Sequence, residues 1–256
     1  MKVANKTWWR IPVINRRDWQ WEDKNNATRD GEWWQNAIIY QISPWSFLDT
    51  DGDGKGDLNG IVERLDYIVS LGVDAIWLTP IYASPMDDLG YDITDMRAIG
   101  KEFGTMEDFQ RLLEISHCMK LKVILDQVWN HTSDKHPWFQ ESRSSRDNAK
   151  ADWYVWADPK PDGSPPNNWL SSFTGDCAWK WEPQREQYYF FNFLESQPDL
   201  NWHNDEVVEA ILERAQFWLD LGVDGLRIDA VNYFLHDPEL RDNPPRPEDA
   251  PMPDGV

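Results

Sequence analysis

The feature that most constrains the fold is a repeated octapeptide. Leu71–Leu78 reads LGVDAIWL and Leu221–Ile228 reads LGVDGLRI, and each copy follows apolar residues at helical spacing. Gly72 and Gly222 are placed where a helix ends in a left-handed residue, a conformation that glycine adopts without steric penalty. Each copy then continues as a short apolar run, which is typical of a buried strand. The repeat therefore predicts two helix–turn–strand units of one kind.

Similar units lie elsewhere along the chain. Apolar runs begin near residues 37, 75, 122 and 225. Segments preceding the last three runs place apolar residues on one helical face: Ile61, Leu65, Ile68 and Val69; Phe109, Leu112 and Leu113; Val208, Ile211, Ala215 and Trp218. Buried strands alternating with amphipathic helices indicate a parallel sheet covered by helices. We predict an α/β fold with four βα units, the first half of a (β/α)8 barrel.

The interval before the last run is far too long for one βα unit. Its excess, roughly His131 to His203, is rich in Trp, Tyr, Phe, Pro and Asn, including Trp153, Trp156, Trp169, Trp179 and Trp181. Such rings could stack on sugars, although packing a small domain is the commoner use of tryptophan. We predict an irregular domain at residues 132–203, here called the insert. The predicted order is an amino-terminal extension (1–32), the first three strands (33–131), the insert (132–203), and the third helix with the fourth strand (204–256).

Composition narrows the classes of partner. The chain has 256 residues and a net charge of −20, without a basic run, which argues against nucleic acid or an anionic membrane surface. No apolar segment suits a signal peptide or a membrane span. Cys118 and Cys177 form no spaced motif, as is usual in a reducing compartment. We expect a cytoplasmic protein; the sequence does not indicate its oligomeric state.

Arg227 and Asp229 alternate within the last apolar run. Two charges on one face of a buried strand cost several kcal/mol to desolvate. The pair is explained if Arg227 keeps Asp229 ionised in a polar pocket at the mouth of a barrel. A positioned carboxylate of this kind is what a covalent glycosidase uses as its nucleophile. A purely structural ion pair is the alternative.

An acidic loop follows the first apolar run. Carboxylates alternate with glycines, and the candidate oxygen ligands are Asp49, Asp51, Asp53, the Lys55 carbonyl and Asp57. Hard oxygen donors on a tight loop suit calcium, although the bidentate glutamate of an EF-hand is replaced by Gly60. We predict a structural Ca²⁺ or Mg²⁺ site, with a solvated acidic turn as the alternative.

Two further polar segments follow apolar runs. Asp126–His131 follows the third run, and Gly90–Asp92, preceded by Asp88, follows the second. Barrel enzymes place their sites at the carboxyl ends of the strands, so these segments should meet at one mouth. There His131 and Asp88 could bind hydroxyl groups, and Tyr91 could stack on a sugar ring.

The order of these motifs resembles glycoside hydrolase family 13, the α-amylase family. It comprises Gly90–Asp92, Asp126–His131, Gln197–Asn201 (QPDLN) and Gly225–Asp229. The QPDLN segment resembles the α-glucosidase and oligo-1,6-glucosidase branch in particular. Asn232–Asp237 with Leu240–Pro245 resembles bacterial α-glucosidases that also transfer glucosyl groups. The likeness runs from about Trp33 onward.

The resemblance implies roles for individual residues. Asp229 would be the nucleophile of a retaining reaction and Arg227 its partner. Asp88, Tyr91, His131 and Phe193 would hold the glucose being cleaved, and the loop Asp49–Asp57 would match the family's calcium or magnesium site. Valine after the nucleophile accompanies α-1,6 preference in such enzymes, so Ala230 implies α-1,4-linked or other short α-glucosides.

One part of the family pattern is missing from the chain. The acid/base glutamate of the family lies on the fifth strand and would fall beyond Val256, while Glu239 and Glu248 match no motif. We therefore expect the amino-terminal half of an α-glucosidase, inactive by itself. The alternatives are a sucrose- or trehalose-acting relative and a non-catalytic, glycosidase-like protein.

Overall fold

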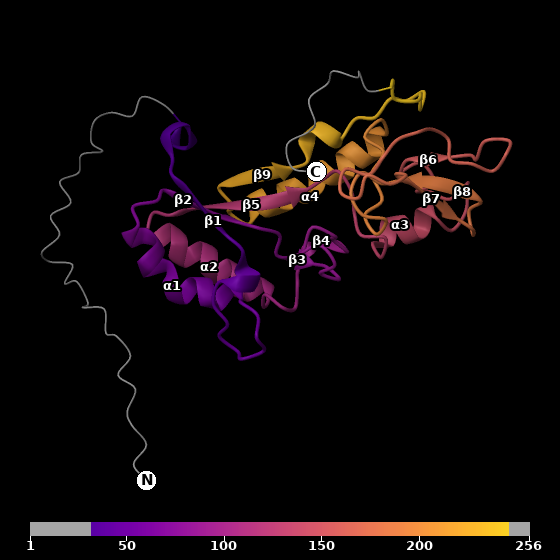
Figure 1. The fold of residues 1–256 in the computed structure, drawn as a ribbon. Helices are drawn as coiled ribbons and strands as arrows, with labels where there is room; N and C mark the ends of the chain where they lie inside the picture. The colour runs from indigo at the N-terminus through magenta and orange to yellow at the C-terminus, as the bar shows by residue number, and fades with distance from the viewer. Residues whose placement is uncertain (1–31, 246–256) are drawn as a thin grey trace, which may run out of the picture. The chain divides into compact units, whose positions relative to one another are not determined.

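The computed structural model describes residues 32–245, and Figure 1 shows the fold. Residues 1–31 of the predicted extension lie outside the described residues, as do residues 246–256, which include Glu248 and the end of the predicted 204–256 segment. The chain divides between Ala37 and Ile38 into two units, each of which is considered by itself. In the described part of the first unit lies a 3-10 turn, η1 (Trp33–Asn36). The elements below belong to the second.

Four parallel strands form the central sheet. They are β1 (Ile39–Ile42), β2 (Ala75–Leu78), β5 (Lys122–Val128) and β9 (Gly225–Asp229), in the order β1-β2-β5-β9. The register sets Ile39 opposite Ala75 and Asp126 opposite Arg227. The predicted parallel strands near residues 37, 75, 122 and 225 are therefore confirmed.

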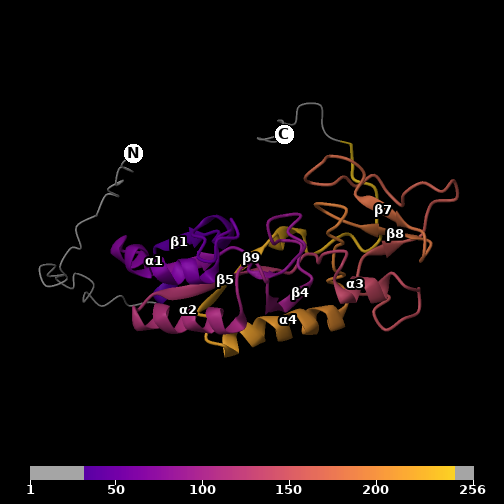
Figure 2. The same ribbon diagram turned by 90° about the horizontal axis from the view of Figure 1, so that it is seen from below.

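Three helices cover this sheet. They are α1 (Leu58–Ser70), α2 (Met106–Cys118) and α4 (Asp205–Asp220), and their apolar faces share one core with the strands. Figure 2 shows α2 and α4 running beside the strands. Gly72 and Gly222 have φ of +79° and +104°, as their places after α1 and α4 predict. One prediction is wrong by a residue, since the buried face of α4 contains Val207 rather than Val208.

The helices begin where side chains satisfy free backbone donors. Asp57 accepts a hydrogen bond from the Gly60 N–H at the start of α1, and Asn204 accepts one from Glu206 at the start of α4. Thr105 and Asp108 form a reciprocal capping box at the start of α2. These caps fix where each helix starts, and so where each preceding strand-to-helix loop ends.

Shorter elements lie at the carboxyl ends of the strands. After β1 comes η2 (Pro44–Ser46), after β2 the antiparallel pair β3 (Tyr82–Ala83) and β4 (Asp95–Ile99), and after β9 the turn η3 (Val231–Tyr233). The insert contains α3 (Pro137–Ser142) and an antiparallel sheet ordered β6-β8-β7, formed by Trp156–Ala157, Gln187–Phe190 and Trp179–Glu182. The exact limits predicted for the insert as a domain stay a prediction.

Tryptophans of the insert serve its packing. Trp169 and Trp179 stack with ring centroids 5.9 Å apart and share a buried cluster with Phe190. Trp156 stacks on Phe139 of α3 with centroids 5.6 Å apart. These rings bury large apolar areas in a region with little regular structure.

Among the described residues, no helix is long and apolar enough to cross a membrane.

Candidate active site

Arg227 links two carboxylates at the carboxyl end of the sheet. Its Nη1 donates hydrogen bonds to Oδ1 and Oδ2 of Asp126, at 3.1 and 3.2 Å, and to Oδ1 of Asp229. Arg227 and Asp229 lie on one side of β9 because residues two apart in a strand face the same way. Burial lowers the pKa of Arg227, but the two carboxylates more than offset this and raise it. The guanidinium therefore stays charged between them.

Asp126 is the member of this group to which sequence reasoning gave no role. Its side chain is 0% exposed and accepts further hydrogen bonds from Trp77 Nε1, at 3.1 Å, and Tyr91 Oη, at 3.0 Å. Burial raises the pKa of Asp126 to about 6, although Arg227 acts in the opposite direction. Its role follows from its register position opposite Arg227 near the end of β5, which no sequence pattern marks.

The loop after β3 presents Asp88 and Tyr91. Its anchor is Asp92, a fully buried residue whose carboxylate accepts hydrogen bonds from Ser84 Oγ and from the backbone N–H of Asp87 and Asp88. Gly90 has φ of +100°, and a Cβ there would lie 3.0 Å from the Pro80 carbonyl oxygen, so the turn favours glycine. In the motif Gly90–Asp92, Gly90 and Asp92 therefore set the shape of the loop, and Tyr91 is the residue that lines the pocket.

Asp88 is the half-buried carboxylate of this loop. Its Oδ2 accepts a hydrogen bond from Nε2 of Gln197, 2.8 Å away, in the QPDLN segment of the insert. Burial raises the pKa of Asp88, and the nearby carboxylates of Asp92 and Asp229 act in the same direction. The contact ties the loop to the insert and leaves Oδ1 of Asp88 available to a ligand.

His131 lies buried between the sheet and the insert. Its Nε2 is 3.2 Å from the carbonyl oxygen of Tyr91, which can only accept, so Nε2 carries the proton in this arrangement. Burial lowers the pKa of His131 to about 4, so the ring is neutral near pH 7. The adjacent Asn130 donates to Oδ2 of the buried Asp199 at 3.0 Å, which holds this loop against the insert.

These side chains surround one small pocket. It has a volume of about 180 Å³ and is lined by Asp88, Tyr91, His131, Phe173, Phe193 and Asp229. This is below the range of about 300–1,000 Å³ typical of drug-sized ligands, and suits a single ring. The structure thus gathers five of the residues predicted for the site, with Arg227 behind Asp229. It adds Phe173, an exposed ring on an irregular loop that no sequence pattern marks.

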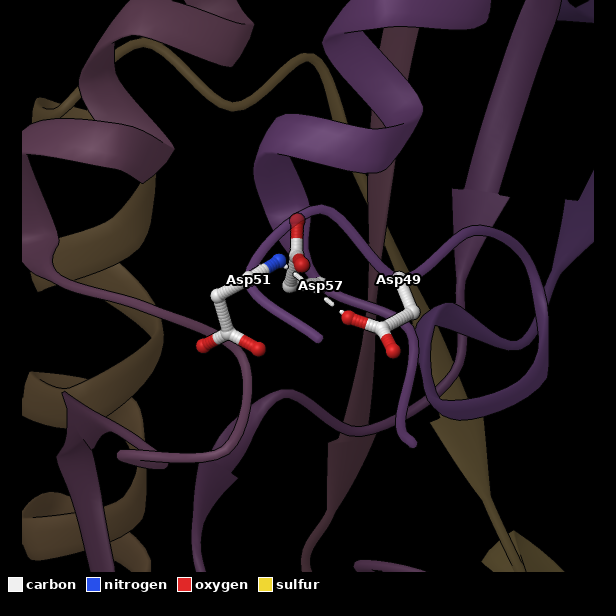
Figure 3. A group of neighbouring side chains, drawn as sticks. All are labelled: Asp49, Asp51 and Asp57. Atoms are coloured by element: carbon white, nitrogen blue, oxygen red, sulfur yellow. Dashed lines mark hydrogen bonds between the residues drawn. The ribbon is translucent and has the colours of Figure 1, made fainter. Parts of the chain in front are cut away.

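The acidic loop lies apart from this pocket, between η2 and α1. Ligand oxygens of Asp49, Asp51 and Asp57 lie within 4.8 Å of one another, and Figure 3 shows the three carboxylates. Asp53 accepts from its own loop, at the Lys55 N–H, and the Lys55 ammonium lies over the Trp45 ring. Asp49 accepts from Gly52 and Gly54, and these bonds lower its pKa. An all-oxygen donor set around a tight loop fits Ca²⁺ or Mg²⁺ chemically.

A parallel α/β sheet with a carboxylate cluster at the carboxyl ends of its strands is the arrangement found in (β/α)8 barrel enzymes. The chain belongs to the α-amylase family: the model for the α-amylase catalytic domain matches residues 41–254. It is 60% identical to a probable α-glucosidase of Rhizobium meliloti over 215 residues, covering 84% of this chain and 39% of that protein. It is 53% identical to an oligo-1,6-glucosidase of Heyndrickxia coagulans, covering 81% and 38%.

Solved structures agree with the sequence relatives. The α-glucosyl transfer enzyme XgtA superposes with a TM-score of 0.83 at 63% identity, covering 84% of this chain and 40% of that one. The trehalose-6-phosphate hydrolase of Bacillus licheniformis gives 0.82 at 47% identity, covering 83% and 38%. The fold class is thereby confirmed, as a partial α/β barrel. The chain spans about two fifths of the length of the curated relatives it matches.

Proposed function

We propose that the protein is a retaining α-glucosidase acting on short α-glucosides. The observation that carries this is the position of Asp229: it faces a pocket of single-ring size while Arg227 holds its carboxylate from behind. A group that only stabilised the sheet would have no need to line a pocket with His131 and aromatic rings. Membership of the α-amylase family and the names of the relatives support the same assignment.

In the proposed reaction, Oδ of Asp229 attacks the anomeric carbon of an α-glucoside. The bond to the leaving oxygen breaks as the bond to Asp229 forms, giving a β-glucosyl ester, which water or an acceptor hydroxyl then cleaves with a second inversion. Asp88 and the rings of the pocket would hold the sugar. His131 would donate Nε2–H to a hydroxyl after exchanging its bond to the Tyr91 carbonyl.

A retaining reaction also needs an acid/base carboxyl roughly 5 Å from the nucleophile. Asp126 does not meet this need, although its pKa is raised to about 6, because its side chain has no exposed surface and is fully occupied by Trp77, Tyr91 and Arg227. We propose that this carboxyl is a glutamate outside the described residues, as the family resemblance implies.

Ala230 after the nucleophile supports α-1,4-linked or other short α-glucosides over α-1,6 linkages. Glucosyl transfer is the second candidate, favoured by the 63% identity to XgtA, which is named for that reaction. Sucrose- and trehalose-phosphate-acting enzymes are also structural neighbours, at 47% identity. The small oligosaccharide is the proposed partner in each case, while a cytoplasmic location stays a prediction.

We also propose a structural Ca²⁺ or Mg²⁺ on the acidic loop. Asp49, Asp51 and Asp57 would supply carboxylate oxygens, with the predicted Lys55 carbonyl and Asp53 as further candidates. Asp57 also caps α1 through Gly60 and accepts from Thr50, so an ion there would brace the start of that helix. It would not take part in bond cleavage, because its place is outside the pocket.

The test is covalent trapping with 5-fluoro-α-D-glucosyl fluoride. Fluoride leaves without being protonated, so the first step needs Asp229 and not the acid/base group, and the ring fluorine slows hydrolysis of the ester. We expect an adduct of one fluoroglucosyl group on the intact protein, located to Asp229 by peptide mass spectrometry. An unlabelled protein, or an adduct on another residue, would refute the assignment.

A further inference from the structure

The segment after β9 crosses from the sheet to the insert. Residues 230–245, here called the strap, begin at Ala230, whose φ of +50° is unusual for a residue with a side chain. The chain then passes through η3 and lies over the insert, as the yellow segment in Figures 1 and 2 shows. The chain therefore turns directly after the candidate nucleophile and continues to the insert.

The strap is bonded to the insert at His203, whose Nε2 lies 2.9 Å from the His236 carbonyl oxygen, and at three consecutive residues, Asn167–Trp169. Asn168 makes three of the hydrogen bonds: its N–H donates to Asp242 Oδ1 at 3.0 Å, its Nδ2 donates to the Asn243 carbonyl at 2.9 Å, and its Oδ1 accepts from the Asn243 N–H at 2.7 Å. Asn167 and Trp169 donate to the carbonyls of Leu240 and Arg241, at 3.1 and 2.9 Å. A single exposed side chain, Asn168, thus contributes two bonds.

The strap and the insert segment bound to it both contact Phe193, which lines the pocket. At the near end of the strap, the Tyr233 ring packs on Phe193 with centroids 5.2 Å apart. At the insert end, the chain continues from Asn168 to Phe173, which packs on Phe193 at 5.0 Å. Ser171 between them donates to the Phe193 carbonyl at 2.6 Å. The strap and the insert loop therefore both pack on Phe193.

We propose that Asn168 is a positioning residue for substrate binding. It fixes the strap to the insert loop, and through Tyr233 and Phe173 it holds Phe193 in place against the pocket. This inference rests on the proposed α-glucosidase function, since it concerns how the same pocket takes its sugar. Asn168 does not line the pocket, so its effect on the ligand is indirect.

The physical basis is preorganisation. Exposed hydrogen bonds each add little to global stability, because water replaces them in the unfolded chain. Their effect on binding is larger when they order groups that a ligand would otherwise have to order itself. Asp229 lies on β9, where Arg227 holds its carboxylate, so we expect its reactivity not to depend on the bonds between Asn168 and the strap.

The experiment separates binding from chemistry by the kinetics of trapping with 5-fluoro-α-D-glucosyl fluoride. In Asn168→Ala we expect the inhibitor constant KI to rise about threefold to tenfold while the limiting rate of inactivation stays within about twofold of the parent. Asp242→Ala should act in the same direction, and Asp242→Asn, which keeps an Oδ1 acceptor for the Asn168 N–H, should restore the parent value.

Asn148→Ala is the matched control. The Asn148 amide donates to carbonyls of Glu141 and Ser145 within the insert and contacts neither strap nor pocket, so KI should not change. An unchanged KI in Asn168→Ala, or equal changes in Asn168→Ala and Asn148→Ala, would overturn the inference while the labelled parent upheld the function. A parent protein that is not labelled at all would overturn both.

Discussion

Aspartates cluster in two regions: at the carboxyl ends of the strands, here called the mouth (Asp126 and Asp229), and on the acidic loop. The repulsion between neighbouring carboxylates is offset differently in each region. At the mouth, Asp126 and Asp229 share one guanidinium, and Asp126 has no exposed side-chain surface. On the loop, Asp49 and Asp51 are exposed and accept hydrogen bonds from neighbouring N–H groups. Water and backbone dipoles support charge at the loop, whereas the mouth needs a fixed counter-charge.

The electrostatic consequences run in opposite directions. Burial raises the pKa of Asp126 to about 6 and that of Asp199, a buried residue of the insert bonded to Asn130, to about 7. Hydrogen bonds from Gly52 and Gly54 lower the pKa of Asp49. Carboxylates at the mouth are therefore held at a cost to stability, which is common where a site is organised for chemistry. Those of the loop are suited to holding a cation.

The largest expected effect is on Asp229. Asp229→Asn should abolish formation of the fluoroglucosyl ester, reducing its rate by at least about a thousandfold, because an amide oxygen is a poor nucleophile. Asp88→Asn is the matched control: it lines the same pocket, so it should raise KI yet leave an adduct on Asp229. Equal loss in both variants would mean that the loss reflects impaired sugar binding and not removal of the nucleophile, which would contradict the role of Asp229.

The second effect tests the counter-charge. Arg227→Met should lower the free energy of unfolding by about 2–3 kcal/mol, because it leaves the buried Asp126 carboxylate without a counter-charge. This is less than the cost of breaking a fully buried pair, because Arg227 is 36% exposed. Urea denaturation measures it.

Arg97→Met is a close control for that variant. Arg227 lies over the Trp77 ring, and Arg97 likewise lies over an aromatic ring, Phe217. Arg97 pairs with the Glu213 carboxylate at 3.2 Å, but on the surface. Its loss should cost under about 1 kcal/mol. Similar costs for the two arginines would show that the mouth is no less hydrated than the surface.

Local pattern in the sequence was enough to predict the sheet, and together with the family resemblance it named five of the six residues that line the pocket. The apolar runs and the glycines after α1 and α4 specify strands and turns directly, because those constraints act within a few residues. Val207 was missed because the apolar face of α4 can be drawn through either valine, and only packing decides. Local periodicity leaves such one-residue choices open.

The missed site residues depend on distant parts of the chain. Asp126 gains its role from the β5–β9 register, which sets it opposite Arg227. Phe173 reaches the pocket because Ser171 is bound to the Phe193 carbonyl, in a loop without periodicity. Neither relation is written in a local pattern. Positions of this kind are found by geometry, and they include Asn168 of the insert, which binds the strap.

The third effect concerns pH. The pKa of Asp199 is raised to about 7, so between about pH 4 and 7 the unfolded chain releases this proton and the folded chain retains it. Stability therefore falls through this group as pH rises. Asp199→Asn should gain about 2 kcal/mol relative to the parent across that window, less than the full shift implies because water partly relieves buried carboxylates.

The comparison must be made against the parent at each pH. His131, His136 and His236 have pKa values lowered to about 4 by burial, so they make the parent less stable as pH falls below 6.5. These contributions cancel in the difference between variant and parent. Asp162→Asn, at an exposed turn where Ser164 lowers the pKa, should show no change between pH 4 and 7. A flat difference for Asp199→Asn would mean that the carboxyl is already ionised when buried.

The smallest effect tests the acidic loop. At ten times its dissociation constant, Ca²⁺ bound only to the folded protein would add about 1.4 kcal/mol, or roughly 3 °C in Tm for a chain of this size. Asp51→Asn should remove this rise without lowering Tm in chelator, because Asp51 is exposed and caps no helix. Asp57→Ala should lower Tm in both conditions, since it also removes the cap of α1.

Asp53→Ala decides whether the fourth aspartate is a ligand: a Ca²⁺ response equal to the parent's would restrict the site to Asp49, Asp51 and Asp57. If Ca²⁺ and Mg²⁺ leave the parent's Tm unchanged, the loop is a solvated acidic turn. Its aspartates would then differ from those at the mouth only in being stabilised by water and backbone N–H groups in place of an arginine.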